Sequence, residues 1–501
     1  MPSPTKLWID DLSMRFETPS GAFDALDRVS LTVPQGAFVS LIGPSGCGKS
    51  TIFNIVAGLQ EPSRGRVLID GVDATGTIGR VGYMLQKDLL LPWRTLTDNI
   101  ILGMEIQGVP LRRARERALP LLRRYGLAGF EHAYPNALSG GMRQRAALLR
   151  TLLLDTDVIL LDEPFGALDA QTKLRMQEWL LALWSDFSKT VVFVTHDVEE
   201  AIFLSDEVHV MGTRPGRIIE TIPVALPRPR LRSCTTAPAK AVRKLPVQRD
   251  WPAWIILGLQ LGILVAAVAL WEIGAAAGFV DAFFWSRPSA IYNTLKIFFT
   301  TGDAWTDIGF TFRSTIFGFL IGTVAGSALG LSFWWSRNYA AIVQPYIICF
   351  ESLPKLALAP LIVLVFGIGI ASKIAIATAL TLVVSTLTTY AGVKAVDPDG
   401  EKLFYSLGAT RLQVFRKLVI PSCLPWIISV LRVNIGLALT GAVVGEFIAS
   451  QHGLGRAILY AGQTYDIALV WVAVAVLSTL AVIMYVTVSW MERVLRKGVK
   501  S

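Results

Sequence analysis

The chain has 501 residues, of which 52% are apolar and 17% charged, and its mean hydropathy is +0.51. This composition excludes a fully disordered chain, and it is too apolar for one ordinary soluble domain. Its cysteines, Cys47, Cys234, Cys349 and Cys423, are too few and too scattered for a disulfide scaffold or a cysteine-based zinc site. The first residues lack the apolar stretch of an export signal, so we expect none. Length alone predicts roughly two to four domains.

Two halves of unlike composition follow one another. Residues 1–226 are predicted to form a soluble α/β domain, because short β-rich runs alternate with helical stretches. Residues 227–250 are rich in proline, arginine and lysine and are predicted to form an extended linker, either a solvated tether or a segment drawn to anionic lipid headgroups. Residues 251–501 contain long apolar segments and are predicted to lie in a membrane. The net charge of +9 comes largely from the linker and membrane loops, so we expect no nucleic-acid binding.

A phosphate-binding loop is predicted in the first half. The sequence GPSGCGKST follows the β-rich run 38–42 and precedes an apolar helical segment, which is the strand–loop–helix setting that this motif requires. Glycines let the backbone N–H groups turn toward phosphate oxygens, Lys49 reaches the β- and γ-phosphates, and the Ser50 hydroxyl ligates Mg²⁺. The predicted ATP-binding residues of the loop are Gly43, Pro44, Ser45, Gly46, Cys47, Gly48, Lys49, Ser50 and Thr51.

Two adjacent acids follow a second apolar run. In VILLDEP, Asp162 and Glu163 end a predicted buried strand and point to opposite faces. We expect Asp162 to join Ser50 in holding the metal ion, and Glu163 to activate the attacking water. The two acids indicate a nucleotide hydrolase because a phosphate loop precedes them.

The sequence LSGGMRQR, which begins at Leu138 and precedes Asp162, resembles the signature of ATP-binding cassette (ABC) proteins. Further motifs of that family are present in the same order: Gln86 resembles the Q-loop glutamine, Asp169 the D-loop aspartate and His196 the switch histidine. The resemblance implies an α/β P-loop cassette ATPase with a β-rich and a helical subdomain. The implied signature residues are Leu138, Ser139, Gly140, Gly141, Met142 and Gln144.

The resemblance also implies roles for these residues. Gln86 would contact Mg²⁺ or water and respond to the membrane domain, and His196 would hold the γ-phosphate. Phe16 would stack on adenine, with Phe23 as the alternative. The signature and Asp169 would act on ATP bound to the opposite copy, so a homodimer is implied, with a heterodimer of similar chains as the alternative.

Six transmembrane helices are predicted in the second half, because each needs about 20 apolar residues to cross a bilayer. They lie near residues 252–273, 308–334, 339–366, 371–396, 422–449 and 467–490, and prolines interrupt the third. One set of flanking segments carries most of the Lys and Arg residues, including the linker, the loop 394–417 and the C-terminal tail. This bias predicts that both termini and the ATPase domain are cytoplasmic.

Four charged residues fall within or near these segments: Glu351, Lys355, Arg432 and Glu446. Charges at this depth face a bundle interior or a water-filled path, or they form structural ion pairs. Because Glu446 follows a run of small residues, we select it as the candidate residue of the translocation path.

The segment 397–421 resembles the coupling loop of bacterial importer permeases, with Gly408 and Pro421 in the expected places. It departs from that pattern at Lys402-Leu403-Phe404, where Glu-Ala-Ala is usual. With FESLPKLALAPLIVLVFGIGIASK and GAVVGEFIASQHGLG, it resembles the nitrate/sulfonate/taurine importer family. A helix over 397–416 would then transmit movement from a groove near Gln86.

This resemblance implies an ATP-hydrolysing importer in the bacterial inner membrane that uses ATP and Mg²⁺. Its partners would be membrane lipids, a second copy and an extracytoplasmic solute-binding protein. The solute would be like nitrate, a sulfonate, taurine or a vitamin precursor. Two alternatives stay open: an ABC exporter of a lipid or drug, and a cassette ATPase that regulates without moving a solute. The presence of both Glu163 and His196 disfavours the latter.

Overall fold

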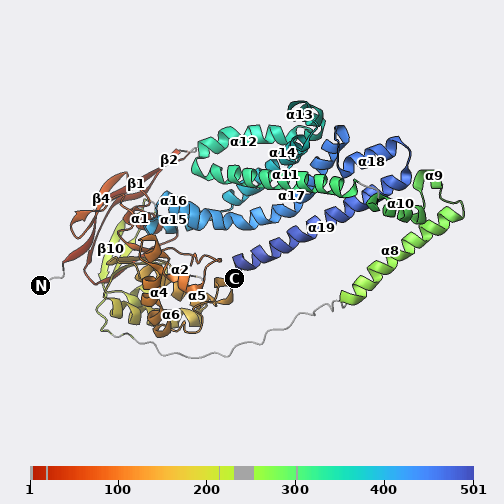
Figure 1. Cartoon of the computed structure of the whole chain (residues 1–501). Helices are drawn as coiled ribbons and strands as arrows, with labels where there is room; N and C mark the ends of the chain where they lie inside the picture. Colours follow the sequence, from red (N-terminus) through yellow and green to blue (C-terminus); the bar gives the residue numbers. More distant parts are fainter. Residues whose placement is uncertain are drawn as a thin grey trace. The chain divides into compact units, whose positions relative to one another are not determined.

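The computed structural model describes residues 4–18, 21–166, 168–213, 215–228, 230, 253–300 and 303–500 (Figure 1). They form two compact units. The first contains the described residues up to Arg230 together with Val396–Pro421, and the second contains Ala253–Ala395 and Ser422–Val499. The predicted linker 227–250 lies almost entirely outside the described residues. At its start, Arg228 forms an ion pair of 2.8 Å with Asp206.

The first unit contains two β-sheets. The smaller is antiparallel with strand order β2-β1-β4-β5, and the larger has the order β10-β9-β3-β8-β7-β6. In the larger sheet β9, β3, β8, β7 and β6 are parallel and β10 is antiparallel to β9. The strands are β1 (Thr5–Thr18), β2 (Gly21–Pro34), β3 (Phe38–Ile42), β4 (Arg64–Ile69), β5 (Val72–Asp73), β6 (Gly82–Met84), β7 (Val158–Asp162), β8 (Thr190–Thr195), β9 (Glu207–Met211) and β10 (Ile218–Pro223).

Helices accompany the larger sheet. They are α1 (Lys49–Val56), α2 (Leu96–Ile100), α3 (Leu102–Ile106), α4 (Leu111–Arg124), α5 (Gly140–Leu152), α6 (Ala170–Phe187) and α7 (Val198–Leu204). Every residue of β7 and β8 is buried, as expected for central strands of a parallel sheet. Their side chains join a continuous hydrophobic core with residues of α2, α4, α5 and α6. This core holds the carboxyl ends of the parallel strands, where the predicted site lies, in a rigid frame.

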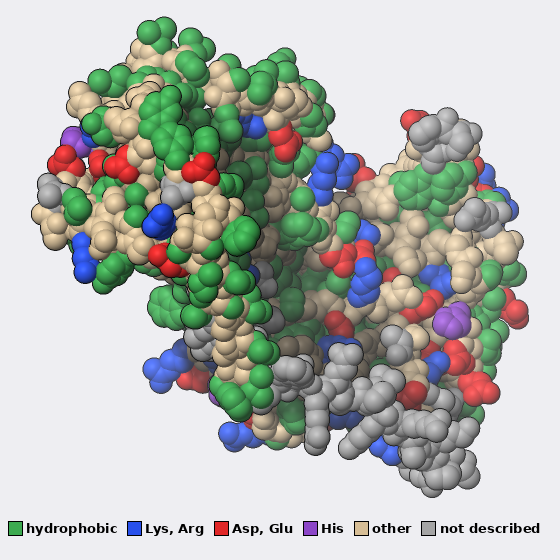
Figure 2. All heavy atoms as spheres, turned by 90° about the vertical axis from the view of Figure 1, so that its right-hand side faces the viewer, with side chains coloured by type: hydrophobic (Ala, Val, Ile, Leu, Met, Phe, Trp, Pro, Cys, Tyr) green, Lys and Arg blue, Asp and Glu red, His purple; other side chains and the backbone are tan. Residues whose placement is uncertain are grey.

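The second unit is helical. Its helices are α8 (Ala253–Ala276), α9 (Ala282–Trp285), α10 (Pro288–Thr300), α11 (Ala304–Ser332), α12 (Arg337–Ser352), α13 (Ala359–Phe366), α14 (Ile370–Lys394), α17 (Ile420–Ile448), α18 (Leu454–Gln463) and α19 (Ile467–Lys500). Figure 2 shows broad areas of hydrophobic side chains on the molecular surface, as expected for a protein with lipid-covered helices.

Within the described residues, five helices are long and apolar enough to cross a membrane. They are Gly258–Ala276, Ala304–Trp335, Ile370–Lys394, Arg411–Ile448 and Ile467–Val494, and they overlap five of the predicted segments. The predicted third segment is instead a pair of helical pieces, 337–352 and 355–366, bent by 79°. The chain bends at Leu353-Pro354 because proline lacks an N–H group and cannot continue the hydrogen bonding of α12.

Helices α11 and α14 pack closely along their length. Small residues recur at every fourth position on both helices, so the backbones can approach closely. The facing pairs are Gly318 with Ala377, Gly322 with Thr381, Gly326 with Ser385 and Gly330 with Thr389. Helix α17 joins them through Asn434, whose amide donates to Thr323 at 2.9 Å and to Ser385 at 2.6 Å. These three helices therefore form the centre of the membrane unit.

The prediction of one continuous helix over 397–416 is wrong. The segment forms α15 (Pro398–Ser406) and α16 (Arg411–Val414), followed by a π-helical turn that leads into α17. Gly408 has a φ of +83°, which ends α15, and Thr410 begins α16 with a reciprocal capping box to Gln413.

Candidate nucleotide site

The phosphate loop connects β3 to α1, as the sequence predicts. Gly46 and Gly48 have φ values of +80° and +99°, and Gly48 directly precedes α1. Glycine adopts these angles without steric cost, so the loop can turn its N–H groups toward an anion. The Lys49 ammonium group donates to the carbonyls of Gly43 at 2.7 Å and Pro44 at 3.0 Å. Cys47 is buried within the loop.

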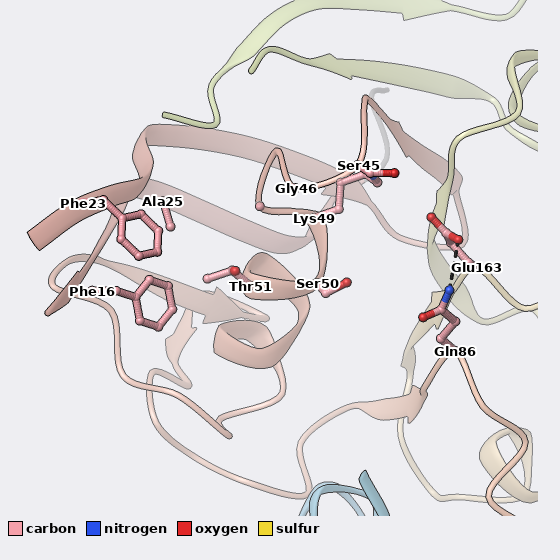
Figure 3. Close-up of a pocket in the computed structure, with 11 residues that line it drawn as sticks. Phe16, Phe23, Ala25, Ser45, Gly46, Lys49, Ser50, Thr51, Gln86 and Glu163 are labelled. Atoms are coloured by element: carbon pink, nitrogen blue, oxygen red, sulfur yellow. Dashed lines mark hydrogen bonds between the residues drawn. The ribbon is translucent and has the colours of Figure 1, made fainter. Parts of the chain in front are cut away.

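A cavity of about 340 Å³ opens beside this loop. Figure 3 shows Phe16 and Phe23 at one end, Gln86 and Glu163 at the other, and the phosphate loop between them. The two aromatic rings come from β1 and β2 and stack with centroids 5.5 Å apart. The cavity therefore has an aromatic end suited to a base and a polar end suited to phosphates.

Glu163 lies where three segments meet. Its carboxylate accepts a hydrogen bond from Gln86 Nε2 at 3.3 Å, and its other oxygen lies 3.4 Å from His196 Nδ1. Glu163 has a φ of +43°, an uncommon value for a non-glycine residue, directly after β7. The structure thus brings together the three residues that the sequence predicts to be catalytic.

Asp162 is almost fully buried one residue earlier. Burial raises the pKa of its carboxyl group above the ordinary value, and a hydrogen bond with the Ser50 hydroxyl opposes that rise. Tyr83 also donates to Asp162, at 3.4 Å. A cation beside this carboxylate would favour its ionised form.

Ser50 and Asp162 supply hard oxygen atoms to one location, which suits Mg²⁺. Within the described ranges, no group of three or more His, Cys, Asp or Glu side chains is arranged to hold a metal ion. Mg²⁺ takes one or two protein oxygens and completes its shell with phosphate oxygens and water.

The signature residues line a different cavity. Ser139 caps α5 and accepts a hydrogen bond from the N–H of Met142 at 3.3 Å. Ser139, Gly140 and Gly141 share a cavity of about 310 Å³ with Asp169, and no residue of the phosphate loop lines it. These three signature residues therefore meet Asp169 but not the phosphate loop of the same chain. Of the other predicted signature residues, Gln144 instead lines a cavity with Gln86 and Glu163, and Leu138 is buried in the core.

A third cavity, of about 820 Å³, links the nucleotide site to the predicted coupling loop. Gln86, Glu163 and His196 line it together with Asp397. Lys87, next to Gln86, pairs with Asp397 at 3.3 Å and with Asp399 at 2.9 Å. The hydrogen bond that Lys87 donates to Asp399 lowers the pKa of Asp399. The hydrogen bonds that Lys87 donates to Asp399 and Asp397 raise the pKa of Lys87.

The coupling segment is anchored to the cassette by apolar and charged contacts. Leu403 and Phe404, at the positions that depart from the importer pattern, are fully buried in this unit, and α15 lies against β6. Farther along, the Lys417 ammonium group lies 2.6 Å from Glu105, which also pairs with Arg94. Predicted Gly408 lies at the break between α15 and α16, and Pro421 lies in the first turn of α17.

Sequence reasoning missed the residues that hold the Q-loop. Arg143, in the signature helix, donates to the Asp88 carboxylate at 3.0 Å. Arg150, in the same helix, donates to the carbonyls of Asp88 at 2.7 Å and Leu89 at 2.8 Å. Burial lowers the pKa of Arg150 to about 10. In the sequence, Arg150 stands out as a charged residue among apolar residues, but the sequence does not show which groups it contacts.

Glu446 is almost fully buried in the membrane unit. Its carboxylate accepts hydrogen bonds from the Thr311 hydroxyl at 2.8 Å and from the N–H of Gly455 at 2.8 Å. The N–H of Leu454 in turn donates to Thr311 at 2.9 Å. Glu446 therefore holds the start of α18 against α11, and its predicted place in the translocation path stays a prediction.

The site and the fold define an ATP-hydrolysing cassette carried by a membrane protein. Comparison with known protein families supports this assignment. Residues 26–166 match the family described as ABC transporter. Residues 304–500 match the family described as binding-protein-dependent transport system inner membrane component.

Individual relatives match the cassette half. An uncharacterized ABC transporter ATP-binding protein of Methanocaldococcus jannaschii is 46% identical over 228 residues, covering 46% of this chain and 85% of that protein. The taurine import ATP-binding protein TauB of Rhizobium johnstonii is 43% identical over 241 residues, covering 48% and 91%. TauB of Yersinia pestis is 44% identical over 198 residues, covering 40% and 78%.

The chain belongs to the ABC transporter family, as an importer-type ATPase and an inner-membrane permease fused in one polypeptide. It hydrolyses ATP to drive transport, and its second half is a multi-pass membrane domain.

Proposed function

We propose that two copies of this chain form an importer in which ATP is hydrolysed at two composite sites. The separation of the two smaller cavities carries this proposal: the phosphate loop and the signature residues lie on different surfaces of one cassette. A second copy would bring its Ser139, Gly140 and Gly141 over ATP held by Lys49. Each copy would then complete the other's site.

In each composite site the chain's residues would divide the chemistry among them. Phe16 and Phe23 would hold the adenine, and Ser50 with Asp162 would hold Mg²⁺, which neutralises charge on the phosphates. Glu163 would accept a proton from the attacking water while His196 and Gln86 orient the γ-phosphate and the metal. Asp169 would contact the partner across the interface.

The same site would drive solute movement through the coupling segment. Lys87 is adjacent to Gln86 and paired with Asp397 and Asp399, so a shift of the Q-loop would pull directly on the start of α15. We infer that the solute is small and enters from an extracytoplasmic solute-binding protein. Both termini and the cassette would be cytoplasmic, in a bacterial inner membrane, because Lys and Arg are concentrated on that set of flanks.

Complementation between two inactive variants tests the composite site. In copies carrying Lys49→Ala the phosphate loop would be inactive. In copies carrying Ser139→Arg the signature would be inactive. When the two are co-expressed with different affinity tags and purified through both, one of the two sites in each mixed dimer joins an intact loop to an intact signature. We expect ATP hydrolysis to return in the mixed dimer, although each variant alone is inactive.

Two controls complete the experiment. A copy that carries both substitutions, paired with a Lys49→Ala copy, has no intact site and should stay inactive. If the mixed dimer of single variants were as inactive as this control, sites composed of two chains would be disproved.

A further inference from the structure

Of the four charged residues that the sequence places within or near the spans, Glu351 differs from the other three in the contacts of its side chain. Arg432 pairs with Glu492, and Glu446 accepts hydrogen bonds from Thr311 and Gly455. The Lys355 ammonium group donates to the backbone carbonyl of Glu351 at 3.0 Å. Among the residues that the structure describes, no ion pair or hydrogen bond reaches the Glu351 carboxylate, and this side chain is exposed.

If α12 enters the membrane at Arg337, it carries Glu351 into the apolar layer. Glu351 lies near the end of α12, fourteen residues after Arg337, which at about 1.5 Å per residue is roughly 21 Å along the helix axis. The hydrocarbon layer is about 30 Å thick. A glutamate side chain is too short to reach the polar surface from there, so contact with lipid tails would be costly.

The backbone beside Glu351 is also unsuited to lipid. Helix α12 ends at Ser352, and Leu353 and Pro354 are exposed at the 79° bend. Non-helical backbone at membrane depth is tolerated where it is buried in protein or lines a water-filled cavity. This stretch is not buried within its own chain. Water in a path beside it would form hydrogen bonds with the non-helical backbone and with the Glu351 carboxylate.

We propose that Glu351 lines the solute path and that its carboxylate favours a solute with a cationic or hydrogen-bond-donating group, such as an ammonium group, over a bare anion. This inference rests on the proposed import function and names the chemical class of its solute. Lys355 follows the bend, and its ammonium group reaches back to the Glu351 backbone carbonyl, so it would supply the opposite charge at the bend itself.

Thiol labelling tests whether water reaches position 351. Cys47 and Cys423 are buried, so a Cys234→Ser background leaves Cys349 as the exposed thiol. Cys349 and position 351 belong to the same helix and are two residues apart. Their side chains therefore point in directions about 200° apart around the helix axis, at nearly the same depth. In lipid nanodiscs, the full-length chain would be treated with charged methanethiosulfonates, with and without ATP and vanadate.

The thiol of Glu351→Cys, in a Cys349→Ser chain, should react at least about tenfold faster than native Cys349, because charged reagents partition poorly into lipid. If it reacts no faster than Cys349 in either condition, the path does not pass Glu351 and the proposal is wrong.

A neighbouring reporter tests the charge preference. In a Ser352→Cys, Cys349→Ser chain, labelling rates would be compared for cationic trimethylammonioethyl and anionic sulfonatoethyl methanethiosulfonate. The cation-to-anion ratio should fall by about tenfold when Glu351→Gln is added, since a unit charge one residue away changes the local potential for both reagents. Glu351→Asp keeps the charge and should keep the ratio. An unchanged ratio in Glu351→Gln would overturn the selection by charge.

The labelling rates measured without nucleotide need no ATP turnover, so they separate this inference from the proposed function. Failed labelling with successful complementation between Lys49→Ala and Ser139→Arg would reject the role of Glu351 alone. Successful labelling with failed complementation would reject the composite ATP sites and leave the path in place.

Discussion

We propose that the chemistry of the cassette depends on the carboxylate of Glu163. It touches Gln86 and His196, which come from separate segments, and a backbone φ of +43° holds it at the end of β7. Its partners differ from those of Asp162, which is buried and bonded to Ser50 and Tyr83. Two adjacent acids can thus serve different purposes, because successive side chains at a strand end point in opposite directions.

The substitution Glu163→Gln should leave ATP binding intact and slow hydrolysis by about 100-fold or more, because a positioned general base contributes a factor of that order. Glutamine has almost the same shape and keeps the contact with Gln86. The measurement is steady-state phosphate release alongside binding of a fluorescent ATP analogue. Normal phosphate release in this variant would remove Glu163 as the base.

At the scale of elements, α11 and α14 show how a membrane domain is held together without a hydrophobic driving force between helices. The glycines at positions 318, 322, 326 and 330 share one face of α11, and each meets a small residue of α14. Close backbone approach and the hydrogen bonds of Asn434 replace the burial of large side chains.

Gly322→Ala should lower the thermal stability of the membrane domain by about 1 to 3 kcal/mol, because the added methyl group would lie 2.8 Å from the Thr378 carbonyl oxygen. Gly309→Ala is the matched control in the same helix, since a Cβ there meets nothing within 4 Å. The control should be neutral or slightly stabilising. Thermal unfolding of the purified chain in detergent compares the two variants, and equal melting temperatures would contradict this packing.

The coupling segment, also at this scale, belongs with the cassette although it lies between α14 and α17 in the chain. Its buried Leu403 and Phe404 and its ion pairs with Lys87 and Glu105 connect it to the nucleotide cavity. The physical consequence is a short route from the Q-loop to the base of a membrane helix.

At the scale of the whole molecule, one chain carries one phosphate loop, one signature and one permease half. The two nucleotide-related surfaces cannot act on one ATP within that chain, because they line separate cavities. We therefore propose that a working transporter requires a second copy, and its ATPase rate should then depend on how many copies share one membrane particle.

Nanodiscs that contain a single 54.7 kDa chain should hydrolyse ATP at least about 100-fold more slowly, per chain, than nanodiscs with two, because each site then lacks the donors of a facing signature. Mass photometry separates the two populations, and a coupled ATPase assay measures each. Equal rates per chain would show that one copy suffices.

The sequence by itself determined the motifs of the ATPase and the apolar segments of the membrane domain. A phosphate loop, a strand ending in two acids and a membrane helix each depend on consecutive residues, so their physical requirements are visible in the order of amino acids. Five predicted segments coincide with helices long and apolar enough to cross a membrane for that reason, and prolines marked the bent third segment.

Only the tertiary structure decided which distant groups meet. Lys87 and Asp399 lie more than 300 positions apart, and Arg150 reaches the Q-loop from a helix that looks merely apolar and basic. The same holds for the four intramembrane charges, whose partners are not visible in the sequence. Three have partners supplied by the fold, and the carboxylate of Glu351 has none among the described residues, because pairing depends on which helices pack together and not on local pattern.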